Sequence, residues 1–284
     1  MTPTTSLRRQ AEKAQRLRDL HHQDRAVIFA NAWDVISARI VEEAGFPAIA
    51  TTSAGIANVL GYPDSQHIQC EEMLEVVSRI ARAVRVPITA DMESGYSKTS
   101  LQMYSTSEKL IESGAVGLNL EDSEDDESKL IDLKLYLEKV KAVRQASEDY
   151  NVPLVLNART DAYWWKGAQP KTRMKETIRR ANAFREAGAD CIFVPGLKDL
   201  DEIRLFLRES PGPLNILAGP GVASIPELEA AGVRRVSIGS GGHRAAMGLL
   251  RKVLSQIREQ GTYELISEFG IPFAEINDLL RRRK

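Results

Sequence analysis

The segment EAGFPAIA at residues 43–50 decides the fold, because its plan returns three more times along the chain. Each copy ends a polar–apolar helical stretch, places a glycine where the helix stops, and continues into a short apolar strand. Glycine is favoured there because the backbone enters the left-handed region. Repeated helix–strand units of this kind predict a parallel sheet. The other copies are ESGAVGLN at 112–119, EAGADCIF at 186–193 and AAGVRRVS at 230–237.

The spacing of these segments predicts a closed barrel of eight units. Neighbouring copies lie one or two lengths of roughly 35 residues apart, so about eight units fit in the chain. The predicted fold is α/β: a (β/α)8 TIM barrel with an extra amino-terminal helix at 6–20 and carboxy-terminal helices near 263–269 and 273–282. No Gly/Ser/Pro-rich linker divides the chain, so residues 1–284 are expected to form one domain, with 262–284 as a helical extension. Strands are expected at 27–30, 48–52, 88–92, 117–121, 154–158, 191–194, 214–218 and 235–238.

Composition narrows the class of protein. The 284 residues include 38 Lys and Arg against 39 Asp and Glu, a formal net charge of -1. This balance argues against a nucleic-acid binder, which needs a basic face. Two cysteines are too few for a disulfide framework. The sequence shows neither a signal-peptide core nor the roughly 18 consecutive apolar residues of a membrane helix, so we expect a cytoplasmic protein without a membrane partner.

Polar side chains stand where predicted strands end, which is where a TIM barrel places its chemistry. Asp91 and Glu93 share one face at the end of the third strand, because side chains alternate along a strand. Glu121 ends the fourth strand in the same way. Carboxylates that converge repel one another and are costly to desolvate, and a divalent cation removes this conflict. Oxygen ligands without neighbouring His or Cys favour Mg²⁺, with Mn²⁺ as the alternative.

The remaining polar groups suit a small carboxylate. Arg159 offers a planar fork to a carboxylate, and the turn at 52–55 offers hydroxyl and backbone N–H groups. A cation beside them would stabilise an enolate. Each residue also has a structural interpretation. Asp34 or Asp161 can cap a helix, Glu121 can be a loop acid, and Arg159 can be an ion-pair partner, so the prediction depends on their joint placement.

The chain resembles the isocitrate lyase/phosphoenolpyruvate mutase superfamily over nearly the whole barrel. The resemblance implies a (β/α)8 barrel whose last helix is exchanged with a neighbouring subunit, in a homo-oligomer such as a dimer or a tetramer of paired dimers. It also implies a small-molecule carboxylate substrate. The segments that carry it are NAWDVISARIVEEAGFPAIATTSAGIA (31–57), VPITADMESGY (86–96), GLNLED (117–122), NARTDA (157–162), EAGADCIF (186–193) and AGVRRVS (231–237).

The resemblance assigns a role to each matching residue. Asp91 is expected to bind Mg²⁺ directly. Asp64, Glu93 and Glu121 are expected to bind the same ion through water. Arg159 would anchor the substrate, and Arg159 and Glu121 are the expected catalytic residues. The other expected substrate-binding residues are Thr52, Ser53, Ala54 and Asn215.

The chain departs from the superfamily pattern at the expected acid. Lyases of the superfamily carry a Lys-x-Cys-Gly-His-type loop after the fourth strand, whereas residues 121–137 read EDSEDDESKLIDLKLYL. The acidic part of this stretch, 121–127, is where a mobile lid is expected. The loop Lys and the Asn or Thr of the mutases are also missing, and Ala50 replaces the tryptophan that packs on their substrate. Tyr96 and Tyr163 are candidate proton donors, while His243 is expected to be a helix cap or a surface residue.

Three functions remain open at this point. The leading one is a Mg²⁺-dependent lyase that cleaves a C–C bond in a small 2-hydroxy or 2-keto dicarboxylate through an enolate. Its substrate would be isocitrate-like or methylisocitrate-like, or it would decarboxylate oxaloacetate. The second is a P–C bond enzyme acting on phosphonopyruvate, and the third is a non-catalytic member that binds metal and carboxylates. An unrelated aldolase would need a Schiff-base lysine where Pro195 stands.

Overall fold

The strands form the predicted barrel. The computed structural model describes residues 5–123, 129–165 and 170–281. Within these residues, nine parallel strands form one sheet in the order β1-β9-β8-β7-β6-β5-β4-β3-β2. β1 (Val27–Phe29) lies within the first predicted strand, and β2 (Asn31–Ala32) continues it beyond the predicted end at Ala30. The two ends of the sheet are therefore continuous along the chain, and the barrel is nearly closed.

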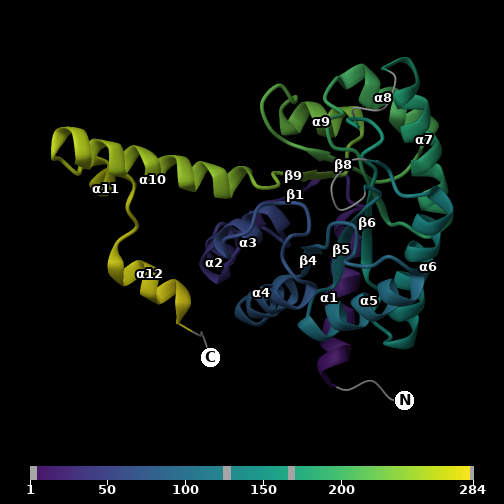
Figure 1. Cartoon of the computed structure of the whole chain (residues 1–284), viewed down its shortest axis with the longest axis horizontal. Coiled ribbons are helices and arrows are strands. Elements are labelled where there is room, and N and C mark those ends of the chain that lie inside the picture. Colours follow the sequence, from purple (N-terminus) through teal and green to yellow (C-terminus); the bar gives the residue numbers. More distant parts are fainter. Residues whose placement is uncertain (1–4, 124–128, 166–169, 282–284) are drawn as a thin grey trace.

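Each remaining strand lies within two residues of its predicted bounds, and helices alternate with the strands around the barrel (Figure 1). The strands are β3 (Ile49–Thr51), β4 (Ile88–Asp91), β5 (Gly117–Glu121), β6 (Val155–Arg159), β7 (Cys191–Phe193), β8 (Leu214–Leu217) and β9 (Arg235–Ser237). The surrounding helices are α2 (Val35–Glu43), α3 (Ser53–Val59), α4 (Cys70–Ala83), α5 (Ser100–Ser113), α6 (Leu133–Asp149), α7 (Pro170–Glu186), α8 (Leu200–Glu209) and α9 (Ile225–Ala231).

The repeated glycines end helices as predicted. Gly114 closes α5 at φ 94° and Gly232 closes α9 at φ 101°, both left-handed, and Gly45 and Gly188 also have positive φ. Each is followed by a strand that is buried on both faces, since helices cover the outer face and side chains fill the barrel. The register Asp91↔Asn119↔Asn157 then aligns polar residues of β4, β5 and β6 inside the barrel.

The extra amino-terminal helix, α1 (Thr5–Leu20), lies across the amino-terminal end of the barrel (Figure 1). Leu17 is fully buried and packs so closely that a side chain at Gly117 would meet its Cδ2 atom at 3.0 Å. His21, just after the helix, reaches Arg235 inside the barrel, with Nε2 3.3 Å from a guanidinium nitrogen. α1 therefore closes this end and leaves the opposite end as the mouth.

The carboxy-terminal helices form an arm that leaves the barrel (Figure 1). α10 (Gly241–Gln260) projects outward, and α11 (Glu264–Phe269) and α12 (Phe273–Leu280) follow it. α12 returns to α2, where Arg39 Nε donates to the carbonyl of Leu279 at 2.7 Å. In the described part of the chain, no helix combines the length and apolar character needed to cross a membrane.

Candidate active site

A cavity at the carboxyl ends of the strands brings together the predicted site residues, Asn215 excepted. Its volume is about 160 Å³. A larger depression of about 610 Å³ lies in the arm at 261–268, far from the strand ends, and is an open surface feature. Chemistry in a TIM barrel belongs to the strand ends, so the smaller cavity is the candidate site. Its predicted lining residues are Thr52, Ser53, Ala54, Asp64, Asp91, Glu93, Glu121 and Arg159.

Asp91, the last residue of β4, is held on both carboxylate oxygens. Oδ2 accepts from the Ser53 backbone N–H at 3.1 Å and from the Ser53 hydroxyl at 2.8 Å. Oδ1 accepts from Asn119 Nδ2 at 3.3 Å. The Asn119 oxygen in turn accepts from Asn157 Nδ2 at 2.8 Å, which fixes the direction of its amide. The side chain of Asp91 therefore has a defined orientation at the floor of the cavity.

The side chain of Glu93 is directed into the cavity by a turn, and not by the alternation of side chains along a strand. β4 has already ended at Asp91, and Glu93 has φ 50°, in the left-handed region. Its side chain is nevertheless buried, and its Oε1 accepts from the Tyr96 hydroxyl at 3.2 Å. Burial, then the charges of Asp91 and Asp64, raise the pKa of Glu93 to about 8. Burial and the neighbouring acids therefore disfavour the charged form of Glu93.

Arg159, the last residue of β6, lies between two carboxylates. Its NH1 is 2.6 Å from Glu121 Oε2, and its Nε and NH2 donate to the two oxygens of Asp161 at 2.7 and 3.0 Å. The guanidinium also lies 5.2 Å from the Trp164 ring and 5.8 Å from the Phe193 ring. Burial raises the pKa of Glu121 well above its ordinary value, against the opposing charge of Arg159. The guanidinium is thus held in a fixed position by its partners.

The described acidic side chains of the cavity are not arranged to bind a metal ion through three direct protein ligands. In residues 5–123, 129–165 and 170–281, no three His, Cys, Asp or Glu side chains surround one point closely enough to hold a metal ion directly. Protein donors instead engage the carboxylates: Ser53 and Asn119 bind Asp91, Tyr96 binds Glu93, and Arg159 binds Glu121.

Asn215 is the predicted site residue that does not line this cavity. The structure buries it completely inside the barrel, where its Oδ1 accepts from the Ser237 hydroxyl at 3.3 Å. The β8 residue that lines the cavity is Leu217, two positions further along the strand. Asn215 therefore lies one layer of side chains below the mouth, because the strand continues past it before the cavity opens.

Three further expectations are resolved by the structure. Asp34 caps α2, which is the structural role that the sequence allowed for it. Its Oδ1 accepts a hydrogen bond from the Ser37 backbone N–H at 2.7 Å. His243 is neither a cap nor a surface residue: it is buried in the first turn of α10, edge-on to Trp33 at 5.1 Å between ring centroids. Neither Tyr96 nor Tyr163 lines the cavity. The predicted lid at 121–127 lies largely outside the described residues.

Sequence reasoning assigned no role to several side chains that shape the cavity. Asn119 carried a usable signal, because it shares a strand face with Glu121, but its role of orienting Asp91 depends on the register of β4 and β5. Trp164 and Phe193 carried no sequence signal of this kind, because their contact with Arg159 depends on how a loop and a neighbouring strand fold.

Comparison with known proteins identifies relatives over most of the chain. The sequence model of the phosphoenolpyruvate phosphomutase family matches residues 17–258. An uncharacterised Mycobacterium tuberculosis protein is 36% identical over 222 residues, covering 78% of this chain and 81% of its own length. Oxaloacetate decarboxylase from Rhodopseudomonas palustris is 30% identical over 263 residues, covering 89% and 87%.

Solved structures agree with this relationship. A Burkholderia cenocepacia J2315 protein superposes with a TM-score of 0.89 at 33% identity, covering 97% of this chain and 99% of its own. Oxaloacetate acetylhydrolase in complex with the product oxalate superposes with a TM-score of 0.83 at 26% identity, covering 94% and 93%. Because the family match spans most of the barrel and the relatives align along nearly their whole length, the chain belongs to the phosphoenolpyruvate phosphomutase family, within the phosphoenolpyruvate mutase/isocitrate lyase superfamily.

Proposed function

We propose that the protein is a divalent-cation-dependent carbon–carbon lyase for a small 2-keto or 2-hydroxy dicarboxylate, with oxaloacetate as the first substrate to test. The observation that carries this proposal is the cavity of about 160 Å³ that four carboxylates and one guanidinium line together. Relatives named oxaloacetate decarboxylase and oxaloacetate acetylhydrolase support a substrate of this size and charge.

The acidic residues suit a hard cation. The raised pKa of Glu93 reflects burial and neighbouring acids that disfavour its charged form, and a cation would relieve that repulsion. Because no three acids among the described residues converge directly, the arrangement favours one direct carboxylate, Asp91, with Asp64, Glu93 and Glu121 acting through water. Mg²⁺ commonly binds in this way, and Mn²⁺ is the alternative. When bound, the cation would stabilise the negative charge that develops on the substrate's 2-oxygen.

Arg159 is the proposed anchor for a substrate carboxylate. Three of its five N–H donors face Glu121 and Asp161, so its terminal nitrogens keep donors for a ligand. The two acidic partners fix the plane of the fork, which is what bidentate recognition of a carboxylate requires. The other proposed substrate contacts, Thr52, Ser53 and Ala54, line the same cavity.

Decarboxylation is the favoured form of C–C cleavage. In oxaloacetate the C3–C4 bond would break, its electron pair would move towards the C2 carbonyl, and CO₂ would leave the enolate of pyruvate. A proton is needed only afterwards, at C3, so this reaction makes the smallest demand on a protein acid. That demand fits a chain whose segment after β5 lacks the cysteine loop of the superfamily's lyases.

Product analysis by NMR tests the proposal. Oxaloacetate, isocitrate, 2-methylisocitrate, dimethylmalate and phosphonopyruvate are each incubated with Mg²⁺ or with EDTA, using wild type, Asp91→Asn and Asp201→Asn. Asp201 is the matched control because it is exposed on α8 and paired with Arg204. We expect Mg²⁺-dependent pyruvate and CO₂ from oxaloacetate with wild type and Asp201→Asn, reduced at least about 100-fold in Asp91→Asn. Turnover that EDTA and Asp91→Asn both leave unchanged would refute the proposal.

A P–C bond enzyme is the second candidate, because the matching family is described as phosphoenolpyruvate phosphomutase. Ala50 argues against it: this residue is buried in β3 and offers no aromatic surface to a phosphonate substrate. Conversion of phosphonopyruvate alone in the same panel would select this candidate. Oxalate binding without any turnover would select the non-catalytic alternative.

We also propose that the arm mediates homo-oligomerisation. Met247, Leu250, Leu254 and Ile257 follow a spacing of three and four residues along α10, so they form one face, and each is exposed in the single chain. Such a contiguous apolar face is typical of a subunit contact. Exchange of this helix with a neighbouring subunit, as the family resemblance implies, would cover it.

A further inference from the structure

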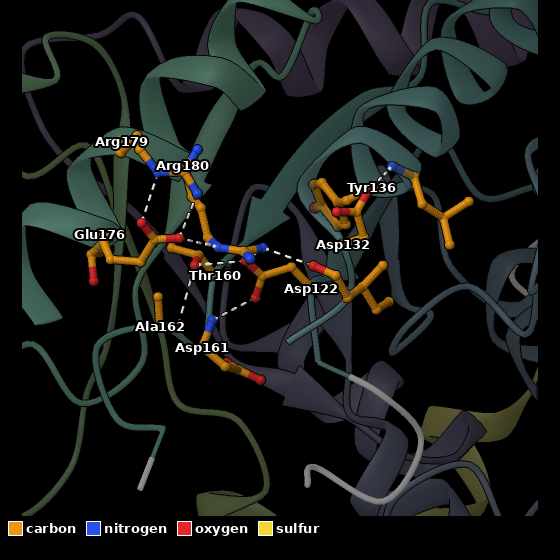
Figure 2. A network of polar contacts seen from close by, with 12 residues as sticks. Asp122, Asp132, Tyr136, Thr160, Asp161, Ala162, Glu176, Arg179 and Arg180 are labelled. Atoms are coloured by element: carbon orange, nitrogen blue, oxygen red, sulfur yellow. Dashed lines mark hydrogen bonds and ion pairs between the residues drawn. The ribbon is translucent and has the colours of Figure 1, made fainter. Parts of the chain in front are cut away.

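A buried polar network involves the residues that directly follow β5 and β6, Asp122 and Thr160 among them (Figure 2). At its centre is Asp122, the residue directly after β5, whose side chain is completely buried. It uses both carboxylate oxygens. Oδ1 accepts from the Asp161 backbone N–H at 2.8 Å, and Oδ2 accepts from the Thr160 hydroxyl at 2.8 Å. Asp122 thus holds the two residues that follow β6.

Arg180, on α7, compensates the negative charge of the Asp122 carboxylate. Arg180 NH1 lies 3.1 Å from Asp122 Oδ2, and the Arg180 side chain is only 8% exposed. Removing one member of a buried ion pair leaves the other charge uncompensated. Without Arg180, Asp122 would therefore lose its hold on the segment after β6.

Arg180 is itself fixed from two sides. Its Nε donates to Glu176 Oε1 at 2.8 Å within α7, and its NH1 also donates to the carbonyl of Ile131 at 3.1 Å. Ile131 N donates back to the carbonyl of Asp122 at 2.7 Å. Figure 2 shows the Arg180 side chain extending between Glu176 and Asp122. The guanidinium therefore joins α7 to the segments that follow β5 and β6.

The network ends in the cavity. Asp161, whose backbone is held by Asp122, binds Arg159 through both carboxylate oxygens at 2.7 and 3.0 Å. The backbone of Asp122 adds a second link, since its N–H donates to the Arg159 carbonyl at 3.1 Å. A shift of Asp161 would rotate the plane of the Arg159 guanidinium. Misplacement of a binding group by even about 1 Å can cost a large factor in affinity or rate.

We propose that Arg180 is a positioning residue for substrate binding: through Asp122 and Asp161 it fixes the plane of the Arg159 guanidinium. This inference rests on the proposed role of Arg159 as the carboxylate anchor. Arg180 does not line the cavity, so its effect on binding must pass through the network.

The test measures oxalate binding to the full chain by calorimetry in the presence of Mn²⁺, and Mn²⁺ binding alone by electron paramagnetic resonance. We expect Arg180→Met to weaken oxalate binding about 10-fold while Mn²⁺ affinity changes less than about two-fold. Arg180→Lys, which keeps the charge beside Asp122, should recover part of the loss. The matched control is Arg179→Met, because Arg179 pairs with the same Glu176 but is 54% exposed; it should leave oxalate binding unchanged.

A double-mutant cycle with Arg159→Lys separates positioning from mere stability. If Arg180 acts through Arg159, Arg180→Met should add little to the loss already caused by Arg159→Lys. Unchanged oxalate binding in folded Arg180→Met, or in Arg180→Lys if only that variant folds, would overturn the inference. So would full additivity in the cycle. Unchanged oxalate binding in Arg159→Lys would instead refute the proposed anchor itself, and this inference with it.

Discussion

At the scale of single residues, two arginines of the barrel strands, Arg159 and Arg235, differ in their partners. Arg159 faces two carboxylates, whereas Arg235 has no carboxylate partner in the described chain. The Arg235 guanidinium lies 4.2 Å from the Phe29 ring, donates to Asn119 Oδ1 at 3.3 Å, and lies 3.3 Å from His21 Nε2. Next to that cation, a charged imidazole is strongly disfavoured, so the fold requires a neutral His21.

This requirement predicts a pH dependence of stability. Burial, then the Arg235 charge, lower the pKa of His21 from 6.5 to about 3. Between these values the unfolded chain binds a proton that the folded chain does not, so the free energy of unfolding falls as pH falls. The His21 contribution is complete above pH 6.5 and is lost towards pH 3, with a slope of up to about 1.4 kcal/mol per pH unit.

Urea unfolding of wild type and His21→Gln between about pH 4.5 and 7 measures this slope. Glutamine can donate to the Leu17 carbonyl, which lies 2.8 Å from His21 Nδ1, and can accept from Arg235 without titrating. We expect the free energy of unfolding to depend less steeply on pH in His21→Gln than in wild type. His67→Gln is the control and should keep the wild-type slope, because His67 is exposed. Equal slopes in wild type and His21→Gln would show that His21 is not held neutral.

At the scale of elements, the turn after β4 places Glu93 in the cavity through left-handed backbone. Glu93 and Tyr96 both have φ 50°, and Gly95 between them has φ 92°. A Cβ at Gly95 would lie 2.5 Å from Met103 Sδ and 2.9 Å from Leu120 Cδ1. A side chain at this position would therefore strain the backbone and force Met103 and Leu120 to shift.

Gly95→Ala should destabilise the protein through two effects. A left-handed alanine costs about 1 kcal/mol, and overpacking against Met103 and Leu120 adds roughly 1–3 kcal/mol. Gly61→Ala is the matched control, because Gly61 has φ 86° but nothing lies within 4 Å of the point where an added Cβ would stand. Chemical denaturation should give a larger loss for Gly95→Ala than for Gly61→Ala. Equal losses would mean that backbone strain alone acts at Gly95.

Much of the barrel was predictable from sequence because its units carry local signals. Gly114 and Gly232 mark helix ends, and the apolar run after each defines a strand whose faces follow from alternation. Local signals fail where long-range packing decides the outcome. The family resemblance placed Asn215 at the site, but the β8 residue that lines the cavity is Leu217. His243 is buried because Trp33, from the opposite end of the sequence, packs against it.

At the scale of the whole molecule, the arm carries large apolar side chains that are exposed to solvent in the single chain. α10 projects from the barrel instead of packing along it (Figure 1). Leu250 and Leu254 are 48% and 57% exposed there, and Phe273 at the start of α12 is 87% exposed. Burying such a group of leucines under another subunit removes apolar surface from water, which favours association.

This arrangement predicts a homo-oligomer that the arm holds together. Light scattering coupled to size-exclusion chromatography should give wild type a mass that is a multiple of 31.5 kDa. Leu250→Arg with Leu254→Arg should shift it towards the monomer, because two buried charges would oppose association. Lys252→Ala, an exposed position on the same helix, is the control and should keep the wild-type mass. A monomeric wild type at micromolar concentration would contradict the proposed contact.

Anomalous diffraction from crystals soaked with Mn²⁺ and oxalate tests the central claim most directly, because it locates the cation without relying on turnover. The account predicts one Mn²⁺ peak in the cavity, bonded to Asp91, with oxalate between the ion and Arg159. An empty cavity, or a Mn²⁺ peak that does not touch Asp91, would contradict the assignment of the carboxylates at the ends of β4 and β5 as a cation site.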